Sequence, residues 1–132
     1  MKISVDTNVL IRIVLQDEPN QVAVATDLFR QASLIVIPLP CLCEMVWVLK
    51  QGFKLSNDDI ILSLEKMLNI QKVKLNRSAV EQGLKLLKMG GDFADGVMEY
   101  EGSVLGGEVF CSFDKKAIKL LQEQGKSVKL LG

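Results

Sequence analysis

Short runs of consecutive apolar residues alternate along the chain with longer segments in which apolar residues recur every three or four positions. The first pattern is typical of buried strands, and the second of amphipathic helices. The apolar runs predict five strands, near residues 3–5, 34–37, 73–75, 109–111 and 127–130. The periodic segments predict seven helices, near residues 8–15, 20–32, 39–51, 57–69, 78–89, 92–105 and 114–124.

Proline, serine and glycine mark where the predicted helices begin and end. Pro19 and Pro40 stand in the first turns of two helices, where a missing backbone N–H is tolerated. Ser56 begins a Ser-x-x-acid sequence, which is typical of a capped helix N-terminus. Glycines follow four of the helices, at Gly52, Gly90–Gly91, Gly106–Gly107 and Gly125.

The alternation of strands with helices predicts an α/β fold. Strands that are apolar throughout are typical of a parallel sheet whose two faces are covered by helices. The length of 132 residues suits one domain, 1–132, and we find no linker or internal repeat. In such sheets the site lies beyond the carboxyl ends of the strands, so the residues that follow each strand are the first candidates.

The composition excludes several classes of site. The chain has 16 Lys and Arg, 16 Asp and Glu, and no histidine. Ser-His-Asp and Cys-His nucleophile systems and histidine-based zinc sites are therefore impossible. Any hydrolytic chemistry must use carboxylates, together with a hard cation. The three cysteines, at 41, 43 and 111, are too few for a disulfide scaffold or a zinc knuckle.

No segment predicts secretion or insertion into a membrane. The chain enters a strand directly after Met1. Its longest apolar stretch, residues 34–43, contains two prolines and is too short to span a bilayer. The cysteines suit a reducing compartment. We therefore expect a soluble cytoplasmic protein.

Two aspartates follow predicted strands, Asp6 after the first strand and Asp114 after the fourth. The carboxyl ends of parallel strands meet at one edge of the sheet, so we expect both acids at that edge. Aspartate after a strand is also the commonest kind of helix N-cap. Both interpretations stand for each residue.

Glu44 lies in a predicted helix, residues 39–51, that is apolar nearly all round. We therefore expect this helix to be buried. A buried carboxylate is unfavourable unless it is paired or coordinated. A salt bridge to a basic group such as Arg12, or a bound metal ion, would satisfy it.

The predicted helix over 92–105 has an acidic stripe. At about 100° per residue, one face holds Asp92, Asp95, Glu99 and Ser103. Like charges on one face repel each other unless a cation lies among them. The helix dipole favours acids in the first turn, which explains Asp92 and Asp95 but not Glu99.

Together the acids predict a site for a hard divalent cation, because ligand sets made of carboxylates favour Mg²⁺ or Mn²⁺. Such a site attracts an anion bridged through the metal, and a phosphodiester suits it. The metal would activate water and stabilise the leaving 3′-oxygen. The acids in question are Asp6, Glu44, Asp95 and Asp114, with Asp92 and Glu99 nearby.

Four segments resemble the acidic motifs of PIN-domain ribonucleases, and most closely those of VapC-type toxins of bacterial toxin–antitoxin pairs. They are Asp6-Thr7-Asn8-Val9-Leu10, Glu44-Met45-Val46-Trp47-Val48-Leu49, Asp92-Phe93-Ala94-Asp95 and Ser112-Phe113-Asp114-Lys115-Lys116. Their order and spacing agree from residue 2 to about 130. The resemblance implies a PIN-like three-layer sandwich, a five-stranded parallel sheet flanked by helices, and a Mg²⁺- or Mn²⁺-dependent endoribonuclease.

The resemblance also implies roles for single residues. The positions of the catalytic, metal-holding acids are matched by Asp6, Glu44, Asp95 and Asp114. Asp92 matches a more variable acid, and Glu99 is a candidate ligand behind the others. Polar positions that orient the acids through hydrogen bonds are matched by Asn8 and Ser112. Gly96 replaces the usual alanine, which costs about 1 kcal/mol of helix propensity and is expected to loosen Asp95.

RNA requires basic contacts, and lysines supply them. Lys50 and Lys54 follow the helix of Glu44, and five more follow Ser112, at 115, 116, 119, 126 and 129. Aromatic residues are few, so we expect recognition of RNA by shape and backbone rather than by base stacking. The resemblance implies a homodimer held inactive by a small antitoxin protein.

Two other classes stay open. Receiver-like and phosphatase-like domains also place aspartates around Mg²⁺ at strand ends. The first motif has Asn8 where an Asp-x-Asp phosphatase needs a second acid, and residues 73–76 offer no aspartate for a receiver to phosphorylate. A non-catalytic module with the PIN fold is the other alternative, and the presence of all four acids argues against it.

Overall fold

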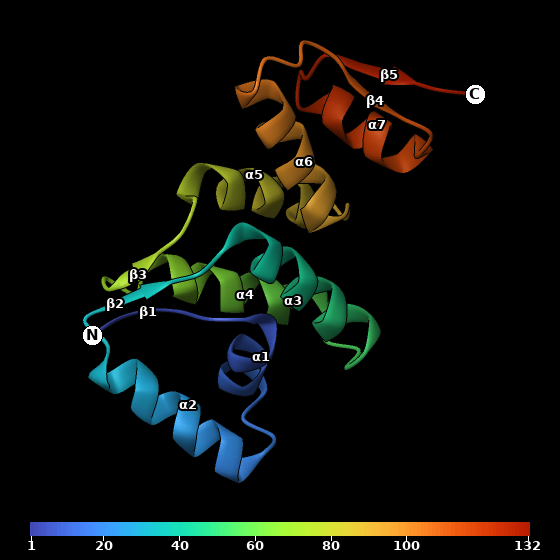
Figure 1. Ribbon diagram of the computed structural model, residues 1–132. Coiled ribbons are helices and arrows are strands. Elements are labelled where there is room, and N and C mark those ends of the chain that lie inside the picture. The colour runs from blue at the N-terminus through green and yellow to red at the C-terminus, as the bar shows by residue number, and fades with distance from the viewer. The chain divides into compact units, whose positions relative to one another are not determined.

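Every strand and helix that the sequence predicts is present in the computed structural model, which describes residues 1–132. The ends of the elements differ from the predicted ends by at most one residue, which is within the usual uncertainty of helix and strand boundaries. The chain forms a first unit, Met1–Asn76, and a second unit, Arg77–Gly132, which are described separately (Figure 1).

The first unit contains three parallel strands and four helices. The strands pair in the order β1-β2-β3, with Ile3 opposite Ile35 and Ile35 opposite Val73. Their bounds are β1 Lys2–Ser4, β2 Leu34–Val36 and β3 Val73–Lys74. The helices are α1 Thr7–Leu15, α2 Pro19–Gln31, α3 Leu39–Gln51 and α4 Asn57–Leu68.

The second unit contains two parallel strands and three helices. Its strands, β4 Phe110–Ser112 and β5 Val128–Leu130, pair with Cys111 opposite Lys129. Its helices are α5 Arg77–Lys88, α6 Phe93–Val104 and α7 Lys115–Glu123. The predicted α/β class with parallel strands is therefore confirmed.

The single five-stranded sheet is not what the structure shows, because the strands form sheets of three and two. Each strand is only two or three residues long and pairs with strands of its own unit. Periodicity predicts where a strand lies, but it does not specify which strand is its neighbour.

Each unit has its own apolar interior. In the first unit, fully buried side chains come from the strands and from α1, α3 and α4, among them Leu10, Ile35, Leu42, Met45, Leu49, Ile60 and Leu64. In the second unit, Leu86, Leu120 and Leu121 form a cluster against which Phe110 and Val128 pack. Burial of these side chains fixes where the ends of α1, α3, α6 and α7 lie within their own units.

The expected cap and stop residues are confirmed. Ser56 Oγ accepts a hydrogen bond from the Asp59 backbone N–H at 3.2 Å and caps α4. Gly90 follows α5 with φ of 89°, and Gly125 follows α7 with φ of 80°. These are left-handed conformations that side chains rarely adopt, which is why glycine ends both helices.

Helices α5 and α6 approach each other closely through two glycines. A Cβ atom at Gly96 would lie 2.8 Å from the Gln82 carbonyl oxygen, and one at Gly83 would lie 2.7 Å from the Phe93 ring. Gly96 therefore has a packing role that the sequence did not indicate, because this glycine lets the first turns of α6 pack directly on α5.

No helix of the chain is both long enough and apolar enough to cross a membrane. The cysteines form no disulfide.

Candidate active site

Asp6 and Glu44 lie near a common neighbour in the first unit, the thiol of Cys41. Burial raises the pKa of Cys41, a hydrogen bond with the Thr7 side chain lowers it, and the charges of Asp6 and Glu44 raise it further. Asp6 precedes α1 and Glu44 lies in the second turn of α3. The packing of α1 on α3 thus brings both predicted acids within electrostatic range of Cys41.

Glu44 is exposed, which corrects the prediction that its helix is buried all round. Cys41, Met45 and Leu49 face the interior of the unit, whereas Trp47, three residues after Glu44, is 64% exposed. Arg12, the predicted salt-bridge partner, instead pairs with Asp17 at 2.8 Å. Glu44 therefore lies on the outer face of α3.

In the second unit, two of the predicted acids act electrostatically on a third. Burial raises the pKa of Asp95 to about 6, and the negative charges of Asp92 and Asp114 raise it as well. Asp92 precedes α6, Asp95 lies half-buried in its first turn, and Asp114 precedes α7. A carboxylate whose pKa is raised by burial and by neighbouring acids is a candidate functional group.

Three of the acids are helix N-caps, which the alternative interpretation predicted for Asp6 and Asp114 but not for Asp92. The Oδ1 atoms of Asp6, Asp92 and Asp114 accept backbone N–H hydrogen bonds from Val9 at 3.2 Å, Ala94 at 3.1 Å and Ala117 at 3.1 Å. A cap bond uses one carboxylate oxygen and fixes the orientation of the other. Capping and ligand binding are therefore compatible at these positions.

Ser112 supports Asp114 through the backbone. Its Oγ accepts a hydrogen bond from the Asp114 N–H at 3.0 Å. This contact fixes the turn between β4 and α7 in which the carboxylate lies. The hydrogen bond reaches the backbone of Asp114 and not its carboxylate, so the predicted role of Ser112 in orienting an acid stays a prediction.

Asn8 lies in the first turn of α1 and is exposed. It lines, with Asp6, a cavity of about 440 Å³ between α1 and α2 whose other walls include Arg12, Val24 and Leu28. The structure shows no hydrogen bond between Asn8 and an acid. Its orienting role stays a prediction.

Glu99 is paired with a lysine, and its predicted role as a ligand behind the other acids stays a prediction. Its carboxylate is buried and forms an ion pair with Lys126, at 3.6 Å between Oε1 and Nζ. It does not contribute to the raised pKa of Asp95, four residues earlier on the same helix. Glu99 lies on the same helix as Asp95, as the sequence predicts. Its charge is paired with Lys126, which is distant in sequence.

The donor set fits a hard cation, although neither unit brings three acidic or thiol side chains together as a complete site. All the candidate ligands are carboxylates, the ligands of Mg²⁺ and Mn²⁺. Asp95 is partly desolvated next to two like charges, and a cation beside it would relieve this repulsion.

The comparison with protein families decides the classification. The model of the PIN domain matches residues 3–120. The chain belongs to the PIN domain family. PIN domains are typically nucleases that use divalent metals, in agreement with the carboxylate donor set. Neither a search of curated proteins nor a search of solved structures gave a match.

Sequence reasoning missed two contacts around the acids of this PIN domain. Thr7 and Cys41 lie near Asp6 and Glu44. From the sequence, Thr7 is an ordinary helix residue and Cys41 is a small buried hydrophobic residue. The sequence gives Lys126 as one of several surface lysines and does not indicate its ion pair with Glu99. The position of Thr7 directly after Asp6 was the only available signal, and nothing local marks Lys126 as the partner of Glu99.

Proposed function

We propose that this PIN domain is a Mg²⁺- or Mn²⁺-dependent endoribonuclease, with Asp6, Glu44, Asp95 and Asp114 as its catalytic carboxylates. The observation that supports this most is the pKa of Asp95, which is raised to about 6 by burial and by Asp92 and Asp114. A half-buried carboxylate in an acidic cluster is typical of a functional site rather than of a solvated helix end.

The residues of the chain have distinct tasks in this proposal. Asp6 and Asp114 are fixed by their cap bonds, so their second oxygens point in set directions. Asp95 supplies the most desolvated carboxylate, and Ser112 holds the turn of Asp114. A bound divalent cation would supply an activated water and charge stabilisation for the phosphodiester.

Basic residues in the second unit suit a polyanion. Lys115, Lys116 and Lys119 are exposed on α7, directly after Asp114. Contacts from such lysines to phosphates position an RNA without reading its sequence. They place positive charge next to one of the catalytic acids.

The test is cleavage of RNA by purified protein free of other proteins, with Mg²⁺, with Mn²⁺ and with a chelator. We expect cleavage with either metal and none with the chelator. Asp6→Asn and Asp95→Asn should lower the rate by at least about a hundredfold. Asparagine is as good an N-cap as aspartate, so Asp6→Asn leaves the start of α1 capped.

The matched control is Asp58→Asn, which removes an exposed first-turn aspartate from α4 and should cleave at the wild-type rate. Cleavage that is unchanged in Asp6→Asn or Asp95→Asn would contradict the proposal. Absence of cleavage with both metals, together with metal-dependent hydrolysis of p-nitrophenyl phosphate, would favour a phosphatase-like domain instead.

We further propose that the protein is the toxin of a toxin–antitoxin pair, acts as a homodimer in the cytoplasm and is inhibited by a small antitoxin. The support is the resemblance of its four acidic segments to those of VapC-type toxins. Expression of the chain should arrest growth, and co-expression of a short neighbouring reading frame should restore it. If the Asp95→Asn variant arrests growth as strongly as the wild type does, a toxin role based on cleavage would be contradicted.

A further inference from the structure

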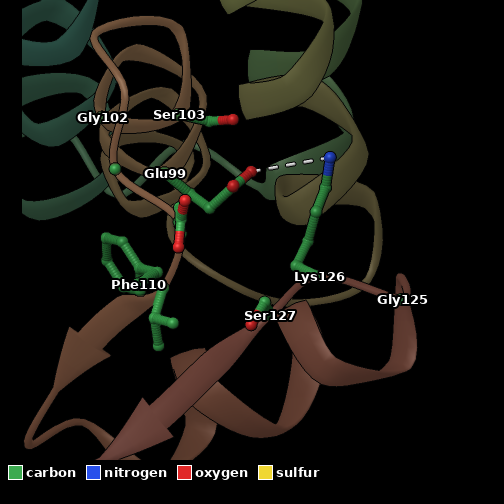
Figure 2. A pocket seen from close by; sticks show the side chains of 10 residues that line it. Glu99, Gly102, Ser103, Phe110, Gly125, Lys126 and Ser127 are labelled. Atoms are coloured by element: carbon green, nitrogen blue, oxygen red, sulfur yellow. Dashed lines mark ion pairs between the residues drawn. The ribbon is translucent and has the colours of Figure 1, made fainter.

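A second polar cavity lies in the Arg77–Gly132 unit, between the later turns of α6 and the starts of β4 and β5. It has a volume of about 240 Å³, many times the ~10–15 Å³ that one water requires. Figure 2 shows Glu99 and Ser103 from α6, Phe110 from β4, and Lys126 and Ser127 from the segment that leads into β5. None of these residues belongs to the proposed set of catalytic carboxylates.

Glu99 is the unusual group in this cavity. The residue is only 9% exposed, and its Oε1 atom is buried without a hydrogen-bond partner. Lys126 Nζ lies 3.6 Å from that oxygen, an ion-pair distance that is longer than a charge-assisted hydrogen bond. Figure 2 shows the carboxylate pointing toward the ammonium group, with a dashed line for their ion pair.

A buried carboxylate oxygen without a hydrogen bond is unfavourable, so a ligand that donated to Glu99 Oε1 would stabilise it. The ligand that fits needs adjacent N–H donors for Glu99 and an acceptor for Lys126. The serine hydroxyls of Ser103 and Ser127 adapt to either role. Phe110 supplies an apolar wall suitable for a flat ring.

We propose that this cavity binds the Watson–Crick edge of an unpaired guanine. The N1–H and 2-amino groups of guanine donate side by side, which matches the two oxygens of the Glu99 carboxylate. Its O6 atom accepts from the Lys126 ammonium. This inference rests on the proposed function, since it makes the cavity a base-reading pocket for the RNA that the protein cleaves.

The other common occupants fit less well. Cytosine and adenine have a ring-nitrogen acceptor beside the amino donor. That acceptor would face an oxygen of the Glu99 carboxylate, which is also an acceptor. Uracil offers a single N–H donor. A divalent cation is disfavoured because the Lys126 ammonium already lies 3.6 Å from the buried oxygen, and no third ligand of its kind completes a site.

The experiment is a titration of the full chain, without metal, with guanosine, adenosine, cytidine and uridine 5′-monophosphates, followed by backbone amide NMR. We expect saturable shifts with the guanine nucleotide at Gly125, Lys126 and Ser127. The other three should bind at least tenfold more weakly. Inosine 5′-monophosphate, which lacks the 2-amino donor, should bind less tightly than the guanine nucleotide.

Glu99→Gln preserves the size of the side chain but loses the paired acceptor, so it should weaken guanine binding roughly ten- to hundredfold. Lys126→Met should weaken it severalfold, and it provides a second variant if Glu99→Gln does not fold. Glu101→Gln, an exposed glutamate on the same helix, is the matched control and should bind as the wild type does.

Equal shifts with all four nucleotides, shifts outside the cavity, no shifts at all, or unchanged binding by Glu99→Gln would overturn the proposal. Those results would leave the Glu99–Lys126 pair as an ion pair with no ligand. Because the titration needs neither metal nor cleavage, its result tests the pocket independently of the proposed nuclease activity. Guanine binding without RNA cleavage would support the pocket and contradict the nuclease, and the reverse result would contradict the pocket alone.

Discussion

Asp95 is a single residue whose ionisation lowers the stability of the fold. Its folded-state pKa is about 6, above the ordinary value of ~3.9 for aspartate in an unfolded chain. The folded protein therefore holds this proton more tightly than the unfolded chain does. From this group, the free energy of unfolding falls as the pH rises from about 4 to about 6, and the loss persists at higher pH.

Asp95→Asn removes a charge that the metal-free fold disfavours. We expect its melting temperature at pH 7.5, in the presence of a chelator, to exceed that of the wild type by about 3–5 °C, the effect of ~1 kcal/mol in a domain of this size. At pH 4 the two proteins should melt at nearly the same temperature. Thermal denaturation at both pH values measures this difference, and a variant that is less stable at pH 7.5 would refute it.

The same pKa gives a pH dependence for metal binding. In the proposed site Mn²⁺ binds the carboxylate form of Asp95, so we expect the affinity to fall about tenfold for each pH unit below about 6. Calorimetric titration of the wild type between pH 5 and pH 8 measures this change. An affinity that stays constant across this interval would show that Asp95 is not a ligand.

Helix packing is the feature that most constrains the elements of the second unit. Gly96→Ala places a Cβ 2.8 Å from the Gln82 carbonyl oxygen on α5. The helices must then separate, and we expect a loss of about 1–3 kcal/mol in the free energy of unfolding. Gly102→Ala is the matched control on the same helix, because nothing lies within 4 Å of its added Cβ.

Alanine is the better helix former, so Gly102→Ala should raise the free energy of unfolding by up to about 1 kcal/mol. Chemical denaturation of both variants gives the comparison. If the two substitutions shift the stability in the same direction, the close approach of α5 and α6 is not the reason for Gly96.

Lys72 connects two elements of the first unit through hydrogen bonds. Its Nζ donates to the backbone carbonyls of Phe29 and Arg30, and to that of Ala32 at 3.1 Å. These carbonyls lie at the C-terminus of α2, where the helix dipole favours a cation. One lysine therefore ties the end of α2 to the segment that enters β3.

Lys72→Met should lower the free energy of unfolding by about 1–2 kcal/mol, since the carbonyls lose charge-assisted hydrogen bonds. Lys74→Met, at an exposed position on β3, serves as the control and should change it by less than about 0.5 kcal/mol. Urea denaturation of the two variants measures the contrast. Equal effects would mean that Lys72 does not hold the end of α2.

The elements were predictable because their signals are local. Apolar runs, the capping serine at 56 and the glycine at 125 each act within a few residues of their own position. The exposure of Glu44 was not predictable, because an apolar helix with an outer Trp47 has the same pattern as one that is buried all round. The pairing of Glu99 with Lys126 joins residues far apart in sequence, and no periodicity describes such a pair.

At the scale of the whole molecule, the sequence predicts the PIN family but not the arrangement of its sheet. The acidic motifs occur at the ends of elements, where spacing along the chain is itself informative, and the family model matches residues 3–120. Strand pairing depends on contacts distant in sequence, and the structure shows sheets of three and two strands. The chain has no histidine, so a paired-histidine mechanism that uses the RNA 2′-hydroxyl is not open to it.

The chemistry at the ends of the cleaved RNA tests the central claim most directly. Attack by water on the phosphodiester, with the 3′-oxygen as leaving group, gives 3′-hydroxyl and 5′-phosphate ends. We predict these ends for the wild-type protein with Mn²⁺, and no products from Asp95→Asn. Products with 2′,3′-cyclic phosphates and 5′-hydroxyls, or equal cleavage by Asp95→Asn, would contradict a metal-dependent nuclease built on these carboxylates.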